Sequence, residues 1–196
     1  MIRRAAISLA KLWAEGGVIP LEVMDAYQYG MELLFSTALN IIIMIFLSVV
    51  SGNTGLFIPY LVTFIPLRIF AGGYHTKRHF SCILFNAIIY SASIFSVNII
   101  SSQTLGIFCF WESMISTIAT FLFAPVPAKN KPLSDEEYRR GKFLSRVLTF
   151  IILVVTILLC ISGKTGSIGW IMMCFGQSSA TVLLLMEVFS TWHPCW

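Results

Sequence analysis

The chain has 196 residues, of which 57% are hydrophobic and only 11% are charged. An average soluble domain carries about 25% charged residues, and a soluble chain of this size buries only about 70% of the surface that its unfolded form exposes. The surplus of apolar residues therefore excludes an ordinary soluble fold and indicates an integral membrane protein. The formal net charge of +4 is too small for a nucleic-acid-binding protein, and no nucleic-acid partner is expected.

Residues 1–29 predict two short amphipathic helices that lie at the membrane interface. In the first, apolar residues recur at helical spacing, while Arg3, Arg4 and Lys11 can reach lipid phosphates. The segment lacks the long apolar core and the small-residue cleavage site that a signal peptide needs. The second stretch opens with Pro20, a residue that is favoured at helix starts.

Six apolar runs follow, and each is interpreted as a transmembrane helix, since a bilayer core of about 30 Å needs about 20 helical residues. The runs cover residues 30–50, 56–70, 83–100, 105–123, 147–161 and 168–189. The second run is short and contains Pro59 and Pro66, so we expect it to pack against protein rather than lipid. The fifth run is also short. The expected fold is one all-α membrane domain over residues 1–196.

Lysine and arginine residues are distributed unevenly among the connecting segments. Twelve of the thirteen lie near the N-terminus, between residues 68 and 78, or between residues 129 and 146, and only Lys164 lies in the remaining loops. Because loops rich in these residues stay in the cytoplasm, the pattern predicts a multi-pass protein of the bacterial plasma membrane with both termini cytoplasmic.

The five cysteines are widely spaced and include no Cys-x-x-Cys pair. The sequence therefore predicts neither a disulfide framework nor a zinc site, and we expect no metal and no cofactor. His193 and Cys195 form a second His/Cys pair close to the C-terminus, which we interpret as part of an interfacial tail.

The segment from Arg68 to Cys82 concentrates groups that can do chemistry, between apolar runs that are almost free of charge. Such groups are costly at a membrane face unless they are solvated or used. Cys82 is expected at the start of the third span, where the helix dipole and neighbouring cations favour a thiolate. His75 can act first as its base and then as the acid that protonates a leaving amine.

The spacing of His75 and Cys82 constrains the local structure. Seven residues of continuous helix would separate their Cα atoms by about 10 Å, which is too far for direct contact. A dyad therefore requires a bend, and Gly72 and Gly73 supply the backbone freedom for it. We expect a re-entrant or interfacial loop that other spans cover. The alternative is that His75 is only interfacial and that Cys82 is a small buried apolar residue.

A spaced pattern in this segment, Arg-x3-Gly-Gly-x-His-x6-Cys, resembles the active-site segment of the AgrB (accessory gene regulator B) family, which processes quorum-sensing peptide precursors in Gram-positive bacteria. Its residues here are Arg68, Gly72, Gly73, His75 and Cys82. Residues 124–133 resemble the basic loop after the family's fourth span, and residues 29–32 resemble the entry to its first span. The likeness extends along nearly the whole chain.

The resemblance implies a cysteine endopeptidase, that is, a hydrolase of the thiol protease class. Cys82, assisted by His75, would cleave an AgrD-like propeptide near its C-terminal part and keep the acyl group as a thioester. In relatives that make thiolactones, a cysteine of the substrate then closes a ring to give the autoinducing peptide. The family also implies a homodimer among membrane lipids. The rival interpretation is a non-enzymatic peptide exporter or permease, whose path would need polar groups in several spans.

Further charged residues are candidates for supporting roles. Glu32 lies two residues into the first span, where it could orient His75 by accepting a hydrogen bond. Arg68 could pair with Glu32, contact the substrate or bind a lipid phosphate. Lys129 and Lys131 open a basic loop that could attract an acidic propeptide tail or contact anionic lipid. The other basic residues of this expected loop are Arg139, Arg140 and Lys142.

Two acids lie inside apparent spans, and an intramembrane acid is a functional candidate by default. They are Glu112 and Glu187. Glu112 is expected far from His75, in a structural pairing or a water pocket. Ser134 followed by three acidic residues predicts the N-terminal cap of a helix.

Overall fold

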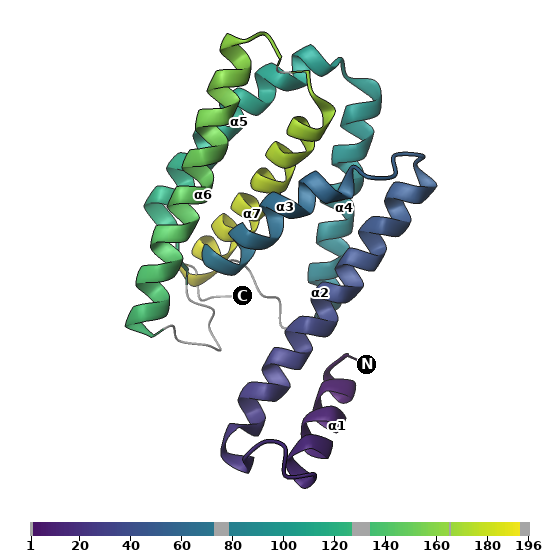
Figure 1. The fold of residues 1–196 in the computed structure, drawn as a ribbon, viewed down its shortest axis with the longest axis vertical. Coiled ribbons are helices and arrows are strands. Elements are labelled where there is room, and N and C mark those ends of the chain that lie inside the picture. The colour runs from purple at the N-terminus through teal and green to yellow at the C-terminus, as the bar shows by residue number, and fades with distance from the viewer. Residues whose placement is uncertain (1, 73–78, 127–133, 165, 193–196) are drawn as a thin grey trace.

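The computed structural model describes residues 2–72, 79–126, 134–164 and 166–192, and within these ranges it is built of helices without a β-strand (Figure 1). The helices are α1 (Ile2–Glu15), α2 (Met24–Val50), α3 (Phe57–Phe70), α4 (His79–Ile99), α5 (Ser102–Phe123), α6 (Asp135–Ile161) and α7 (Ile168–Trp192), with one 3-10 turn, η1 (Leu21–Val23). The expectation of an all-α fold is confirmed for the described part of the chain.

Four of the described helices are long and apolar enough to cross a membrane, and they lie in α2, α5, α6 and α7. Helix α3 and the Ile83–Ile99 part of α4 are shorter apolar helices. The 14 residues of α3 rise about 21 Å at 1.5 Å per residue, less than the roughly 30 Å of a bilayer core. The chain is a membrane protein in which each of the six expected apolar runs lies in a helix, and four of these helices have spanning length.

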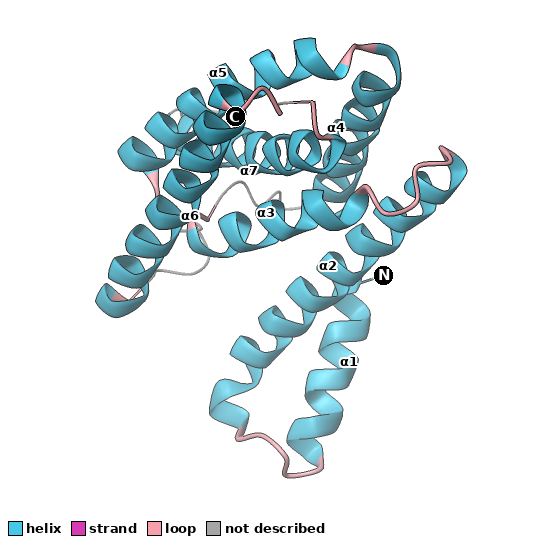
Figure 2. Ribbon diagram, turned by 45° about the horizontal axis from the view of Figure 1, so that its top comes forward, coloured by secondary structure: helices cyan, strands magenta, loops and turns pink. Residues whose placement is uncertain are grey.

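Helices α3 to α7 form a bundle in which α7 contacts α3, α4 and α5, while α6 packs against α3 and α5 (Figure 2). One face of α3 is buried through Tyr60, Thr63, Phe64 and Leu67. The Thr63 hydroxyl donates a hydrogen bond to the Met173 carbonyl of α7 at 2.7 Å. The short α3 is therefore held largely by protein, although its opposite face remains exposed.

The centre of the bundle is organised around Tyr60, which is fully buried. Its hydroxyl donates to Ser179 Oγ of α7 at 2.7 Å, and its ring meets the ring of Tyr90 of α4 edge-on, with 4.9 Å between centroids. The Tyr90 hydroxyl and Ser48 Oγ of α2 lie 2.5 Å apart. Because lipid tails are as apolar as the helices, close packing and interhelical hydrogen bonds of this kind hold membrane helices together.

Helices α1 and α2 form a hairpin whose lower part projects from the bundle (Figures 1 and 2). The expected second amphipathic helix is not separate, because η1 leads directly into α2, which runs unbroken from residue 24 to residue 50. Gly30 does not interrupt α2, since one glycine costs a helix only about 1 kcal/mol.

Helix α6 begins at Asp135, twelve residues before the apolar run at 147–161. Ser134 Oγ accepts a hydrogen bond from the Glu137 amide, and the Glu137 carboxylate accepts one from the Ser134 amide, which completes a capping box. Lysine, arginine and glutamate are good helix formers, so the charged segment extends the helix. Arg139, Arg140 and Lys142 therefore lie on α6 and not in a loop as expected.

Candidate active site at the base of two loops

The chain bends directly after α3, where the sequence predicts that it should. Helix α3 ends at Phe70, and the Ala71 amide donates to the Leu67 carbonyl at 2.8 Å. Gly72 then adopts a φ of 77°, a left-handed conformation that favours glycine. Helix α3 therefore does not continue through Gly72, whereas the expected bend between His75 and Cys82 lies largely outside the described residues.

Gly72 is joined to the segment that follows α5. It forms an isolated parallel bridge with Val126, whose amide donates to the Ala71 carbonyl at 3.1 Å. A Cβ atom on residue 72 would overlap the Val126 carbonyl oxygen. Only glycine fits this position, because both its φ and the approach of Val126 exclude a side chain.

Helices α6 and α7 complete the base of the site. A Cβ atom on Gly141 of α6 would lie 2.8 Å from the Phe70 carbonyl oxygen, so the absence of a side chain lets α6 approach the end of α3. Leu184 of α7 is fully buried against Ala71 and Ala124, with Val126 packed on this cluster. Residues 72 and 126, which directly precede the undescribed segments 73–78 and 127–133, are thus neighbours in the structure.

Arg68 lies in the last turn of α3, one helical turn before the bend. One of its guanidinium nitrogens lies 3.4 Å from the Gly72 carbonyl oxygen, to which it donates a long hydrogen bond. The residue is half-buried and makes further interactions besides this one. Of the candidate site residues, Arg68 and Gly72 thus lie together. The Arg68 side chain contacts the backbone where the chain turns after α3.

The proposed catalytic groups fall mostly outside the described residues. His75 and Gly73 lie in the segment 73–78, and Lys129 and Lys131 lie in the segment 127–133. Cys82 belongs to the first turn of α4, as the sequence predicts, but its side chain is outside the described part of the structure.

Glu32 lies on α2 and accepts a hydrogen bond from the Gln28 amide nitrogen at 3.1 Å. Ser48 of α2 is hydrogen-bonded to Tyr90 of α4, and Asn53, three residues beyond the end of α2, is hydrogen-bonded to Asn98 of α4, so the two helices run side by side in the same direction. An offset of 42 puts residue 79, the first of α4, level with residue 37 of α2. Glu32 therefore lies more than one turn beyond the N-terminal end of α4.

Glu187 is a second acid near the base of the two loops, and sequence reasoning did not place it there. It is only 5% exposed, and it follows Leu184 by three residues, so the two share a face of α7. It also makes interactions with other groups of the protein. Its apolar surroundings in the sequence mark it as unusual, but only the packing of Leu184 on Ala71 and Ala124 reveals its position.

Glu112 lies in the middle of α5, away from this base. Its Oε1 atom accepts a hydrogen bond from Ser116 at 2.5 Å, which is the structural pairing that the sequence suggested. Among the described residues, no group of three histidine, cysteine or acidic side chains is placed to hold a metal ion.

The comparison with known families identifies one family. The sequence profile of accessory gene regulator B matches residues 8–190, a range that includes α2 to α6, most of α7 and the segments 73–78 and 127–133. No curated protein and no solved structure was found to match the chain. The match extends over most of the sequence, so the chain belongs to the AgrB family.

Proposed function

We propose that this protein is a membrane-embedded cysteine endopeptidase in which Cys82 is the nucleophile and His75 its acid–base partner. The proposal rests first on the AgrB family, which is linked to processing of AgrD propeptides. It is supported by one structural observation above all, the bridge between Gly72 and Val126. This bridge joins the residue that precedes the segment with His75 to the residue that precedes the segment with Lys129 and Lys131.

The proposed reaction begins with attack of the Cys82 thiolate on a peptide carbonyl near the C-terminal part of the propeptide. The C–N bond breaks, His75 gives its proton to the departing amine, and the acyl group stays on Cys82 as a thioester. A thiol of the substrate then attacks the thioester, gives its proton to His75 and closes a thiolactone ring, which frees the Cys82 thiolate. This exchange conserves the thioester bond energy only if water is kept away.

We assign supporting roles to the remaining candidate residues. Arg68 would stabilise the turn at Gly72 by donating to the Gly72 carbonyl, and so would support the bridge between Gly72 and Val126. Glu32, on α2, would accept a hydrogen bond from His75 and orient it. Gly73 would add to the backbone freedom that Gly72 supplies. Lys129 and Lys131 attract the acidic tail of the propeptide to the loop.

The proposed topology puts both termini and both loop segments on the cytoplasmic side of the plasma membrane, as the distribution of lysine and arginine predicts. Helices α2, α5, α6 and α7 have the length to cross, and α3 and α4 would carry the active-site segment between them. We further propose that two copies associate in the membrane, which crosslinking of single-cysteine variants would test.

The decisive experiment co-expresses the chain with its cognate propeptide and follows cleavage by mass spectrometry in wild type, Cys82→Ala and His75→Ala. Two matched controls, Cys195→Ala and His79→Ala, remove the same side chains from positions outside the proposed dyad. We expect cleavage to be lost in the first two variants and retained in the controls, with an acyl adduct on wild-type Cys82. Undiminished cleavage by Cys82→Ala would contradict the proposed mechanism.

The alternative is a peptide exporter or permease without catalytic activity. Buried polar residues do occur along α5 and the two helices that pack on it, α6 and α7, including Ser113, Thr149 and Gln177. Membrane vesicles separate the two functions, because an exporter carrying Cys82→Ala would still move a preformed cyclic peptide across the bilayer. A peptidase without transport activity would leave that peptide on one side in wild type as well.

A further inference from the structure

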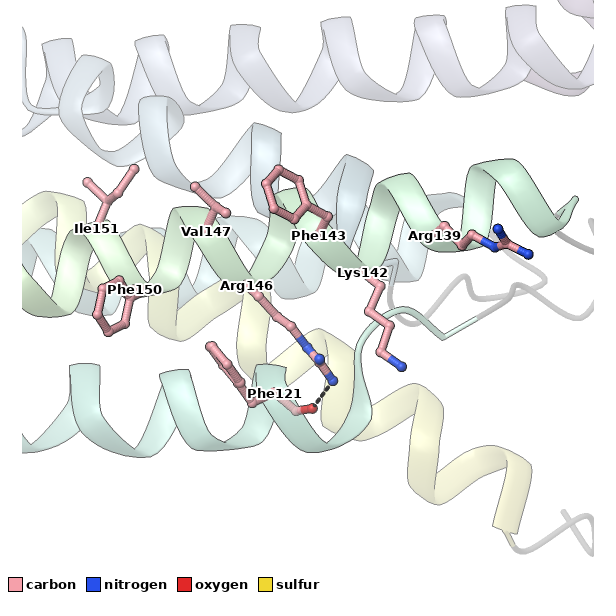
Figure 3. A pocket seen from close by; sticks show the side chains of 8 residues that line it. All are labelled: Phe121, Arg139, Lys142, Phe143, Arg146, Val147, Phe150 and Ile151. Atoms are coloured by element: carbon pink, nitrogen blue, oxygen red, sulfur yellow. Dashed lines mark hydrogen bonds between the residues drawn. The ribbon is translucent and has the colours of Figure 1, made fainter.

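A groove of about 600 Å³ opens between the end of α5 and the charged half of α6. Three cations line it, Arg139, Lys142 and Arg146, and all three come from α6 (Figure 3). Its apolar wall includes Phe121 of α5 and Phe150 and Ile151 of α6. The groove lies on the side of α6 away from the Gly141 contact with α3, and the proposed peptidase chemistry does not use it.

The spacing of the cations puts them on one helical face. Positions 139, 142 and 146 are separated by three and four residues, which is the spacing of neighbours on an α-helix. The apolar lining residues extend two neighbouring rows of α6 toward the middle of the bilayer: Phe150 follows Arg146 by four residues, and Val147 and Ile151 continue the row of Arg139 at the same spacing. One continuous surface therefore changes from cationic to apolar along the helix.

Arg146 is fixed in place by α5 rather than by an acidic group. Its guanidinium donates to the Phe121 carbonyl at 2.7 Å and lies 5.1 Å from the centroid of the Phe121 ring. That carbonyl is one of the last four of α5, so a cation there also favours the helix end. This contact alone would explain a single arginine. It leaves the buried Nε atom of Arg146 without a partner among the described residues.

The depth of the groove follows from the length of α6. The helix has 27 residues, whereas a bilayer core needs only about 20. With Ile161 at one edge of the hydrocarbon, the other edge falls near Lys142. Arg139 and Lys142 then lie at the level of the lipid headgroups, and Arg146 lies one turn deeper, where an unneutralised charge is costly.

We propose that this groove binds one anionic phospholipid. Its phosphate would be held by Arg139 and Lys142, with the positive charge of Arg146 one turn deeper, and an acyl chain would lie along Phe150 and Ile151. Charge complementarity selects an anionic headgroup over a zwitterionic one. The exposed apolar wall, with Phe150 54% and Ile151 52% exposed, selects a lipid over a water-soluble acidic peptide.

Native mass spectrometry of the full-length protein in detergent tests this site directly. Wild type is titrated with phosphatidylglycerol and with phosphatidylcholine of the same acyl chains, and the lipid adducts that survive mild activation are counted. The test variant is Lys142→Gln/Arg146→Gln. Its matched control is Arg140→Gln/Lys164→Gln, which removes the same charge from exposed residues that do not line the groove.

We expect wild type and the control to retain phosphatidylglycerol in preference to phosphatidylcholine, and the test variant to bind phosphatidylglycerol about tenfold or more weakly. A second variant, Arg139→Gln/Lys142→Gln, leaves the contact of Arg146 with Phe121 intact and tests the site even if the first variant does not fold. Its affinity for phosphatidylglycerol should fall about fivefold. No preference in wild type, or an equal preference in the test variants, would overturn the proposal. So would displacement of the lipid by a soluble oligoglutamate peptide, which would assign the groove to an acidic peptide instead.

Discussion

Gly72 and Val126 meet in a parallel backbone bridge that joins the end of α3 to the segment after α5. The bridge leaves no room for a side chain on residue 72. It also brings together residues 72 and 126, which directly precede the segments 73–78 and 127–133. Four predictions test this arrangement and the packing around it.

Substitution of Gly72 by alanine should impair both stability and propeptide processing. The new Cβ would require a left-handed φ and would overlap the Val126 carbonyl oxygen. Strain and displacement of the bridge together should cost about 1–3 kcal/mol. Thermal unfolding in detergent and a cleavage assay measure the two effects.

The matched control for this change is Gly52→Ala. Gly52 has a similar φ of 71°, but no other atom lies within 4 Å of the position that an added Cβ would take. It should therefore show the conformational strain alone and process the propeptide normally. Equal behaviour of the two variants would mean that the contact with Val126 is not needed.

Gly141→Ala should loosen the contact between α6 and the end of α3. Its Cβ would approach the Phe70 carbonyl oxygen to 2.8 Å, and this oxygen belongs to the backbone and cannot rotate away. Overpacking of this kind costs about 1–3 kcal/mol. In contrast, Gly30→Ala lies in open space on α2 and should stabilise the protein by about 0.5–1 kcal/mol through helix propensity. Unfolding midpoints that fall or rise together in both variants would contradict the proposed packing.

Tyr60→Phe should destabilise the bundle by about 0.5–1.5 kcal/mol, because it removes the hydrogen bond to Ser179 but keeps the ring. Ser179 remains partly satisfied, since its hydroxyl also donates to the Phe175 carbonyl. Tyr60→Ala also leaves a cavity and should cost about 3–5 kcal/mol. Tyr138→Phe, at an exposed position on α6, serves as the control and should change the unfolding midpoint little.

Cysteine labelling should discriminate between buried thiols and the proposed nucleophile. Cys109 and Cys174 are 1% and 0% exposed and lie in one apolar cluster. In a Cys82→Ala/Cys195→Ala background, both should react with a maleimide at least about tenfold more slowly in the folded protein than after unfolding in SDS. Rapid labelling in the folded state would show that the interface between α5 and α7 opens. It would also complicate the assignment of an acyl adduct to Cys82.

Several features of this protein were predictable from local sequence. Low charge and long apolar runs identified the membrane, because a bilayer imposes its thickness on the chain. The glycine pair at 72 and 73 predicted backbone freedom, and Gly72 does end α3 with a positive φ. The cap at Ser134 was predicted from the acidic residues that follow it. The start of α6 was not predicted. Apolar residues show only which part of a helix lies in lipid, whereas the helix itself can continue through charged residues.

The residues of each segment were enough to identify the membrane class, the apolar helices and the AgrB-like pattern. Three contacts became visible only in the folded chain: Gly72 lies against Val126, Gly141 touches the end of α3, and Glu187 is buried near the same base. Helices and turns are set by neighbouring residues, whereas these contacts depend on how α3, α5, α6 and α7 pack together, and no periodicity within one segment encodes that packing.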